Sequence, residues 1–248
     1  CTSTNTTYPA VLAYHGHPFY YIPYKYSLLI GPEVWWQNND QSESYLVMQS
    51  YWSCTILVAV AYVMAIHKIQ KVMENREAFN LRSTLIVWNG SLAIFSLMGT
   101  LRMGEEFVHV IRTRPFIDTI TYCLDPHQPA AFWSFCFAFS KFLELVDTLF
   151  VVLRKRKLIF LHWYHHAVTL VYSWHAIKDG TAAGRWFVLM NYVVHSVMYT
   201  YYAVVAAGIR LPRPLSMAVT TLQTTQMFIG VGISFIVFYC KLQGMVRK

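Results

Sequence analysis

The chain has 248 residues, of which 56% are hydrophobic and only 13% are charged, and its mean hydropathy is +0.36. A soluble domain carries about 25% charged residues, so the composition argues against a soluble domain and excludes a disordered chain. The aromatic content of 17% and the net charge of +8 fit a membrane protein with interfacial aromatic residues and basic short loops. We therefore expect membrane lipid around the chain and no nucleic-acid partner.

The first 44 residues are rich in Tyr, Pro and Thr and contain no continuous apolar core. We expect them to form a poorly structured N-terminal leader on the lumenal side, without a cleavable signal peptide. Because residue 1 is Cys rather than Met, we expect the chain to be a fragment or a processed product.

The rest of the chain contains six apolar stretches, each close to the roughly 20 residues that a helix needs to cross a bilayer. They are too long and too continuously apolar for the strands of a membrane β-barrel. We therefore predict an all-α polytopic membrane protein, with a transmembrane domain over 45–240 and a tail over 241–248. The predicted spans are 45–66, 84–103, 130–153, 158–177, 184–207 and 215–240.

The loops between the predicted spans carry an orientation signal. Loops 67–83, 154–157 and 208–214 are short and rich in Lys and Arg, which places them in the cytosol. The leader then lies on the lumenal side, where the sequon Asn5-Thr6-Thr7 can be glycosylated.

The five cysteines have no CxxC spacing, so neither a zinc site nor a disulfide scaffold is indicated. Cys123 and Cys240 both fall on the predicted lumenal side, where a disulfide and two unpaired thiols are both open alternatives. Cys136 is a candidate catalytic nucleophile, as an alternative to the histidines described below. It has no basic neighbour in the sequence closer than Lys141 to stabilise a thiolate, so we expect it to be inert.

An ionisable residue inside a span costs free energy because it must leave water, so each such residue is a candidate functional residue. Lys141, Glu144 and Asp147 lie in the span 130–153 at steps of three, on one slanting helix face. Lys141 and Glu144 can pair, which by itself would only fix helix packing. Three ionisable groups in one span favour a polar cavity.

A cluster of histidines begins the next span. His162, His165 and His166 lie at i, i+3 and i+4 and therefore share one helix face. Three histidines together on an apolar helix are hard to explain as core packing. Metal ligation, acid/base chemistry and nucleophilic catalysis are the functional interpretations.

The span 184–207 carries a polar stripe along one face. Asn191, His195, Tyr199 and Tyr202 lie at i, i+4, i+8 and i+11. Tyrosines alone would indicate an aromatic belt, but Asn and His in the middle of a span favour a site.

Two further features complete the set. Thr220, Gln223 and Gln226 lie at steps of three and, taken alone, indicate interhelical hydrogen bonds. The basic tetrad 154–157 follows the Lys141 group and precedes the histidines. It helps to fix the orientation of the chain in the membrane, and it can also neutralise the phosphates of an anionic ligand that enters from the cytosol.

These motifs, in this order, resemble those of the ELO family of very-long-chain fatty acid elongases. The matching segments are KFLELVDTLFVVLRKR at 141–156, LHWYHHAVTLVYSW at 161–174, MNYVVHSVMYTYY at 190–202 and TTLQTTQ at 220–226. The joint set is specific, whereas HxxHH alone also occurs in membrane desaturases and hydroxylases. The form HWYHH of this motif resembles the one found in the family branch that acts on saturated and monounsaturated acyl chains of about palmitate length.

The resemblance implies a 3-oxoacyl-CoA synthase, an acyltransferase that spans the endoplasmic reticulum membrane several times. Such an enzyme condenses long-chain acyl-CoA with malonyl-CoA and releases CO2 and CoA, the first step of fatty acid elongation. The family fold has seven transmembrane helices, which enclose an acyl-chain tunnel, and we expect six of them in this C-terminally truncated chain. No metal or cofactor is implied beyond the two CoA substrates. The reductases and dehydratase of the elongation cycle and a second copy of the chain are the candidate protein partners.

The resemblance also implies roles for individual residues. The catalytic residues are His165, His195, His162, His166, Asp147 and Asn191. His165 is the expected nucleophile, His195 faces it, and the other histidines orient groups or exchange protons. Asp147 or Asn191 fixes a histidine tautomer through a hydrogen bond. The expected substrate-binding residues are Lys141, Glu144, Arg154, Arg156, Tyr201, Thr220 and Gln223.

Two other functions remain as alternatives. A metal-dependent membrane desaturase or hydroxylase would need more clustered histidines to hold two irons, and only four of the ten histidines are well placed. A non-enzymatic transporter could use the same polar lining, but it would not explain the joint motif set.

Overall fold

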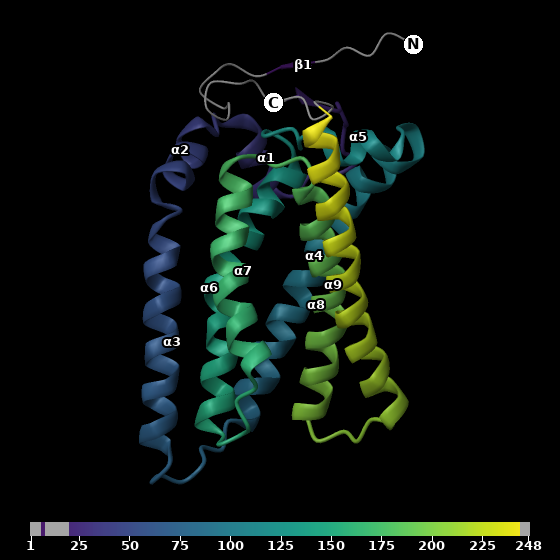
Figure 1. Ribbon diagram of the computed structural model, residues 1–248. Helices are drawn as coiled ribbons and strands as arrows, with labels where there is room; N and C mark the ends of the chain where they lie inside the picture. The colour runs from purple at the N-terminus through teal and green to yellow at the C-terminus, as the bar shows by residue number, and fades with distance from the viewer. Residues whose placement is uncertain (1–5, 8–19, 244–248) are drawn as a thin grey trace. The chain divides into compact units, whose positions relative to one another are not determined.

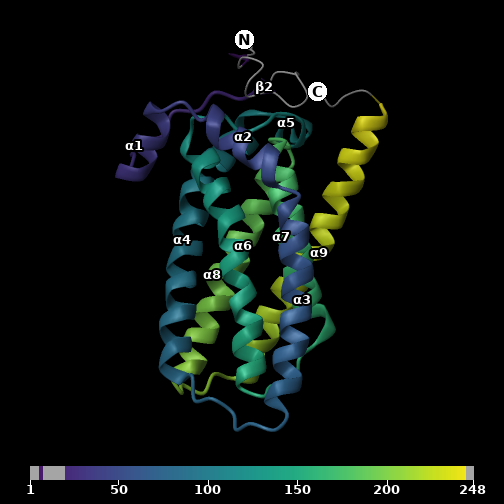
Figure 2. The same ribbon diagram turned by 90° about the vertical axis from the view of Figure 1, so that its left-hand side faces the viewer.

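The computed structural model describes residues 6–7 and 20–243, and these residues are mainly helical (Figure 1 and Figure 2). The described helices are α1 (Gly31–Asn38), α2 (Ser42–Tyr51), α3 (Cys54–Met73), α4 (Arg82–Thr113), α5 (Phe116–Thr121), α6 (Pro129–Leu153), α7 (Phe160–Lys178), α8 (Gly184–Ala206) and α9 (Arg213–Leu242). The strands β1 (Thr6–Thr7) and β2 (Tyr20–Tyr21) form one short antiparallel pair. The predicted all-α class is confirmed.

Helices α6 to α9 begin and end within two residues of the predicted spans, whereas the first two spans need correction. The predicted span 45–66 is divided between α2 and α3. The Thr55 N–H and hydroxyl both donate to the Trp52 carbonyl, at 3.1 and 2.6 Å, and form a turn at the division. Helix α4 continues ten residues beyond the predicted end at residue 103, because Glu105 and Glu106 end the apolar run but are good helix formers. Both carboxylates form ion pairs, with Arg102 and Arg185 respectively.

The predicted leader is more ordered than the sequence indicated. Residues 1–5 and 8–19 lie outside the described residues, but α1 forms inside the leader. The Trp36 indole N–H donates to the Pro126 carbonyl at 2.9 Å. Glu33 binds Arg102 at 2.8 Å and accepts a 2.7 Å hydrogen bond from the Trp133 indole. The expectation of a poorly structured leader is therefore wrong for α1.

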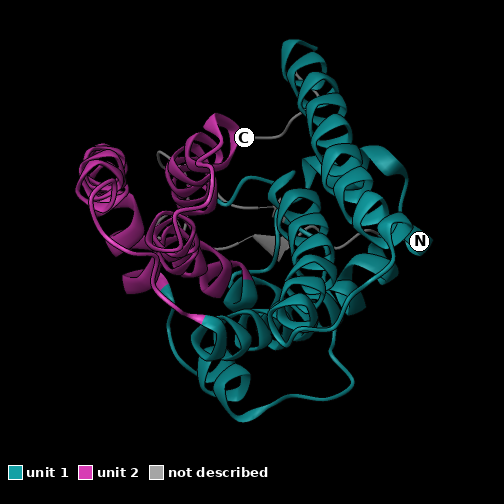
Figure 3. Ribbon diagram, turned by 90° about the horizontal axis from the view of Figure 1, so that it is seen from below, with its two compact units in different colours: residues 1–41, 82–133, 180–248 teal, residues 42–81, 134–179 magenta. Residues whose placement is uncertain are grey.

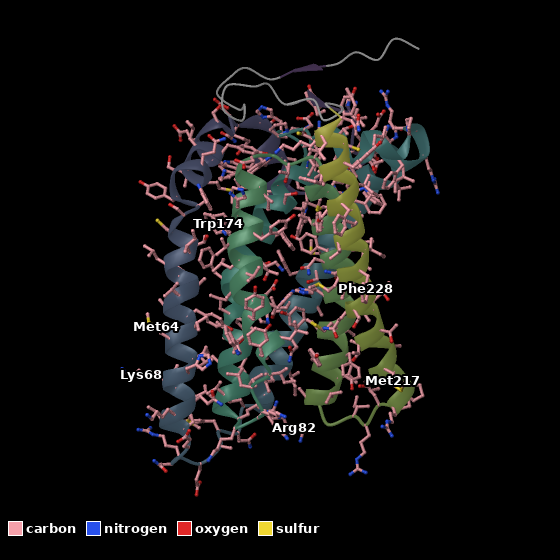
Figure 4. All side chains as sticks on the ribbon, viewed as in Figure 1. Met64, Lys68, Arg82, Trp174, Met217 and Phe228 are labelled. Carbon is pink, nitrogen blue, oxygen red and sulfur yellow. The ribbon has the colours of Figure 1, made fainter. Side chains whose placement is uncertain are left out.

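Among the described residues, three helices are long and apolar enough to cross a membrane, namely α3, α4 and α9. Large apolar side chains lie on the outer faces of two of them. Met64 of α3 is 63% exposed and Phe228 of α9 is 74% exposed, and both point outward (Figure 4). Exposed apolar surface of this kind suits contact with lipid. Helices α6, α7 and α8 match the other predicted spans and carry most of the polar residues of the candidate site.

The chain divides into two compact units (Figure 3). Unit 1 comprises residues 1–41, 82–133 and 180–248, and unit 2 comprises residues 42–81 and 134–179. In unit 2, α3 and α2 pack against α7. The core of unit 2 is a cluster of buried residues from α3, α6 and α7, namely Ala59, Tyr62, Ile66, Met73, Val152 and Ala167.

In unit 1, α8 packs against α4 on one side and against α9 on another. Gly99 of α4 lets the Tyr192 ring approach closely, because a methyl group at residue 99 would lie 2.5 Å from that ring. The Tyr192 hydroxyl donates to the Trp133 carbonyl at 2.8 Å. A stripe with spacings of three and four residues marks the α8-facing side of α9, namely Val219, Gln223, Gln226, Gly230, Ile233, Val237 and Cys240.

The C-terminus of α8 is capped by a side chain from α4. Arg82 donates from Nε to the Ala206 carbonyl at 3.1 Å and from Nη2 to the Ala207 carbonyl at 2.5 Å (Figure 4). A cation is favourable at the negative end of the helix dipole. Gly208 follows with φ +91°, and its missing side chain leaves room for the guanidinium.

Candidate functional site

Lys141 and Glu144 of α6 form a buried ion pair in unit 2. Their side chains are 2.6 Å apart and 2–3% exposed. The Ser140 hydroxyl donates to Glu144 Oε1 at 3.3 Å, and Lys141 Nζ lies 4.2 Å from the centre of the Phe137 ring. The i,i+3 pairing that the sequence predicted is therefore present.

A residue that the sequence analysis missed extends this part of the site. The Tyr62 hydroxyl of α3 donates to Thr148 Oγ1 of α6 at 2.6 Å, and the Thr148 side chain is fully buried. Asp147, the neighbour of Thr148, is partly buried. In the sequence, Tyr62 stands out as a phenol inside an otherwise apolar span. The sequence does not show that Thr148 is its hydrogen-bond partner.

The three histidines of the HxxHH motif lie side by side on α7. The ring centres of His162 and His166 are 4.7 Å apart, and those of His165 and His166 are 5.5 Å apart. His162 Nε2 and His166 Nδ1 are buried and have no hydrogen-bond partner among the residues that the structure describes. Buried ring nitrogens of this kind are available to a ligand or a proton.

The ion pair and the histidines belong to the same unit and influence one another. Lys141 and Glu144 interact electrostatically with both His165 and His166. Helices α6 and α7 are also joined by the Trp174 indole, which donates to the Ala138 carbonyl at 2.9 Å (Figure 4). The structure thus brings the KxxExxDT and HxxHH motifs together.

The second part of the predicted site lies in unit 1. Asn191 Nδ2 is 3.3 Å from His195 Nε2, and both residues are buried on α8. The His195 ring meets the Tyr199 ring edge-on, with 5.2 Å between centres. The i,i+4 spacing therefore makes one polar pair inside an apolar helix.

The remaining predicted substrate contacts of unit 1 differ in burial. Gln223 is partly buried and donates from Nε2 to Met198 Sδ at 2.9 Å. Thr220 is exposed, and its hydroxyl donates to the Ser216 carbonyl of its own helix at 3.1 Å. Tyr201 is partly buried.

The basic tetrad divides into two kinds of residue. Lys155 has φ 52°, and its ammonium group donates to the Glu74 and Arg76 carbonyls at 3.2 and 3.1 Å. It therefore ties the end of α6 to the loop after α3. Arg154 is partly exposed and Arg156 is exposed.

The cysteines of the described segments are free thiols. Cys123 and Cys240 are thus unpaired, which decides between the two alternatives for this pair. Burial raises the pKa of the Cys123 thiol to about 12, although Arg185 acts in the opposite direction. Within 6–7 and 20–243, no group of three or more His, Cys, Asp or Glu side chains is arranged to hold a metal ion.

The predicted site residues therefore fall into two sets. His162, His165 and His166 lie in unit 2 with the Lys141–Glu144 pair, and the Asn191–His195 pair lies in unit 1. Buried imidazoles within apolar helices are typical of a polytopic membrane protein with a chemically active interior.

Comparison with known proteins defines the family. Residues 47–245 match the ELO family, described as the GNS1/SUR4 family. The chain is 49% identical over 220 residues to fatty acid elongase 4 of Caenorhabditis elegans, covering 89% of this chain and 75% of that protein. It is 42% identical over 205 residues to very long chain fatty acid elongase 6 of Homo sapiens, covering 82% of this chain and 77% of that protein. The chain belongs to the ELO family.

Proposed function

We propose that this protein is a fatty acid elongase that condenses long-chain acyl-CoA with malonyl-CoA to give 3-oxoacyl-CoA, CO2 and CoA. The observation that carries the proposal is the histidine cluster of α7 beside the buried Lys141–Glu144 pair, in a chain of the ELO family. The names of the similar proteins support the reaction class. The enzyme works in the endoplasmic reticulum membrane and prefers acyl chains of about palmitate length.

The first half-reaction transfers the acyl group to His165. A neutral ring nitrogen of His165 attacks the thioester carbonyl, the C–S bond breaks, and CoA leaves as the thiol after it accepts the imidazole proton. His162 and His166 orient the ring and relay this proton, and Asp147 helps to hold the tautomer. The ring contacts within the cluster support these roles.

The second half-reaction forms the new C–C bond. Malonyl-CoA loses CO2, and the electron pair of the broken bond becomes an enolate. The enolate carbon attacks the acyl-imidazole carbonyl and the C–N bond breaks. The departing His165 nitrogen takes up a proton from solvent, relayed by His162 and His166, and neutral His165 is regenerated. His195 and Asn191 stabilise the oxyanion that develops, because fixed donors are most effective where charge appears. Their 3.3 Å pairing supports a joint role.

The CoA portion is bound by polar residues outside the histidine cluster. Arg154 and Arg156 contact phosphates, and their exposure at the end of α6 supports this role. Lys141, paired with Glu144, also contacts CoA. Tyr201, Thr220 and Gln223 contact the pantetheine arm or the thioester region.

The acyl-enzyme provides the test. Purified protein in lipid nanodiscs is incubated with radiolabelled palmitoyl-CoA, and the label bound to denatured protein is measured. We expect stoichiometric labelling of the wild type and loss of at least 100-fold for His165→Ala, since the nucleophile is removed. His175→Ala removes an exposed histidine ring of the same helix and is expected to label normally.

Product formation is followed with palmitoyl-CoA and radiolabelled malonyl-CoA. Covalent labelling of His165→Ala would refute the assignment of the nucleophile. The absence of 3-oxoacyl product from the wild type at every acyl length would refute the condensing activity. In that case, iron found in the purified protein would favour a desaturase or hydroxylase, and ligand binding without turnover would favour a transporter.

A further inference from the structure

The stripe of α9 that packs against α8 contains a polar atom that has no hydrogen-bond partner within 6–7 and 20–243. Gln226 lies near the middle of this stripe, between Gln223 and Gly230. Its side-chain Oε1 is buried and accepts no hydrogen bond from any residue that the structure describes. Native proteins rarely leave a buried carbonyl unpaired, so a ligand group is the natural partner for this oxygen.

Two contacts determine the level of Gln226 along α8. Gln223 Nε2 donates to Met198 Sδ at 2.9 Å. A methyl group at Gly230 would lie 3.1 Å from Phe187 Cε1. Helix α9 therefore runs antiparallel to α8, and Gln226 lies between these two contacts.

The corresponding stretch of α8 carries the polar pair described above. Phe187, Asn191 and Met198 lie at i, i+4 and i+11 and share one face of α8. Asn191 Nδ2 is 3.3 Å from His195 Nε2. Gln226 is therefore level with the Asn191–His195 pair, and all of these residues belong to unit 1.

We propose that Gln226 Oε1 accepts a hydrogen bond from the cysteamine amide N–H of the pantetheine arm of the thioester substrates. The proposal rests on the proposed function, in which Asn191 and His195 stabilise the oxyanion that develops during the reaction. Two methylene groups separate the thioester sulfur from this N–H, a reach comparable with one helical turn of about 5 Å. Gln226 is thus a binding residue that recognises CoA-type thioesters by their amide.

A single-atom change in the substrate tests this contact. With palmitoyl-CoA as the acyl donor, the malonyl donor is either S-malonyl-N-acetylcysteamine or its ester counterpart, in which oxygen replaces the amide N–H. The wild type should show a KM about tenfold lower for the amide than for the ester, the effect of about one hydrogen bond. Gln226→Leu should raise the KM of the amide to that of the ester and leave the ester unchanged.

Two other variants serve as controls. Gln226→Glu keeps an acceptor oxygen and should keep the preference for the amide. Thr224→Val alters an exposed residue of the same helix, whose hydroxyl only donates to the Thr220 carbonyl, and should behave as the wild type. If Gln226→Leu is not recovered as a monodisperse protein, the flexible Gln226→Met replaces it.

The outcomes separate this inference from the proposed function. A wild type that makes no 3-oxoacyl product from malonyl-CoA refutes the proposed function. An active wild type whose preference for the amide survives in Gln226→Leu overturns the inference. An equal change in KM for both malonyl donors would show that Gln226 only supports the packing of α9, and would overturn it too.

Discussion

At the scale of single residues, buried polar groups are stabilised by partners that are distant in the sequence. Glu33 is fully buried, yet it accepts hydrogen bonds from Arg102, from the Trp133 indole and from the Ile30 N–H. Burial alone would raise the pKa of the Glu33 carboxyl, but the hydrogen bonds outweigh it and hold the pKa below its ordinary value. The charged carboxylate is therefore the form that the folded chain prefers.

This preference predicts an acid-sensitive contribution to stability. Because the folded-state pKa is depressed, the stabilisation is fully present above the unfolded value of about 4.3 and is lost as the pH falls through the folded value. Glu33→Gln should therefore lower the unfolding temperature near pH 7, and the difference from the wild type should shrink below about pH 4. Thermal unfolding in detergent at a series of pH values measures this.

Glu43→Gln is the matched control, because Glu43 is an exposed carboxylate of α2, the next helix in the sequence. It should follow the wild type at every pH. A Glu33→Gln variant whose deficit stayed constant down to pH 3 would show that the carboxylate charge is unimportant.

At the scale of elements, one arginine fastens several segments of unit 1. Arg185, near the start of α8, is fully buried. It binds Glu106 of α4 through two contacts of 2.9 and 3.1 Å. It also donates to the Thr119, Tyr122 and Cys123 carbonyls at 3.1 to 3.3 Å, at and after the end of α5. This side chain therefore holds α4, α5 and α8 together at one end of unit 1.

Removal of this guanidinium should be costly. Arg185→Met leaves Glu106 as a buried unpaired charge, and breaking a buried pair costs about 3–5 kcal/mol. We expect a large fall in the unfolding temperature or no recoverable folded protein. Arg112→Met, at an exposed position of α4, should change the stability by less than about 0.5 kcal/mol. Equal unfolding temperatures for the two variants would contradict the role given to Arg185.

At the scale of the whole molecule, apolar helices indicate a membrane environment, and basic loops predict the orientation of the chain in the membrane. Three helices of the described residues are long and apolar enough to cross a bilayer. Lys155 and Arg156 lie after the end of α6, in one of the loops that the sequence predicts to be cytosolic. The density of basic residues in these short loops predicts the orientation of the chain in the membrane.

Two chemical reporters test the orientation. Endoglycosidase treatment of microsomal protein should shift the gel mobility of the wild type and leave that of Asn5→Gln unchanged, because the sequon at Asn5 is predicted to be lumenal. The Lys157→Cys variant of a cysteine-free background should react with a membrane-impermeant maleimide in sealed microsomes, where the cytosolic face is outside. Glycosylation at Asn5 together with protection of residue 157 would contradict the orientation.

The sequence by itself determined the helical class, the positions of most helices and the family. These properties depend on local apolar runs and on the residues of the sequence motifs, and both can be recognised without knowledge of how the helices pack. The pairing of Lys141 with Glu144 was also readable, since an i,i+3 spacing places the two side chains together on any helix.

Only the tertiary structure decided which distant residues meet. Three contacts each join residues that are 69 or more positions apart in the sequence. They are the Tyr62–Thr148 hydrogen bond, the Arg82 cap on α8 and the Glu33–Arg102 ion pair that holds α1. Hydropathy predicted the end of one span near residue 103, whereas α4 continues to Thr113 and its Glu106 is paired with Arg185 of α8. The partners of a buried polar group depend on how helices pack, and local periodicity does not encode that packing.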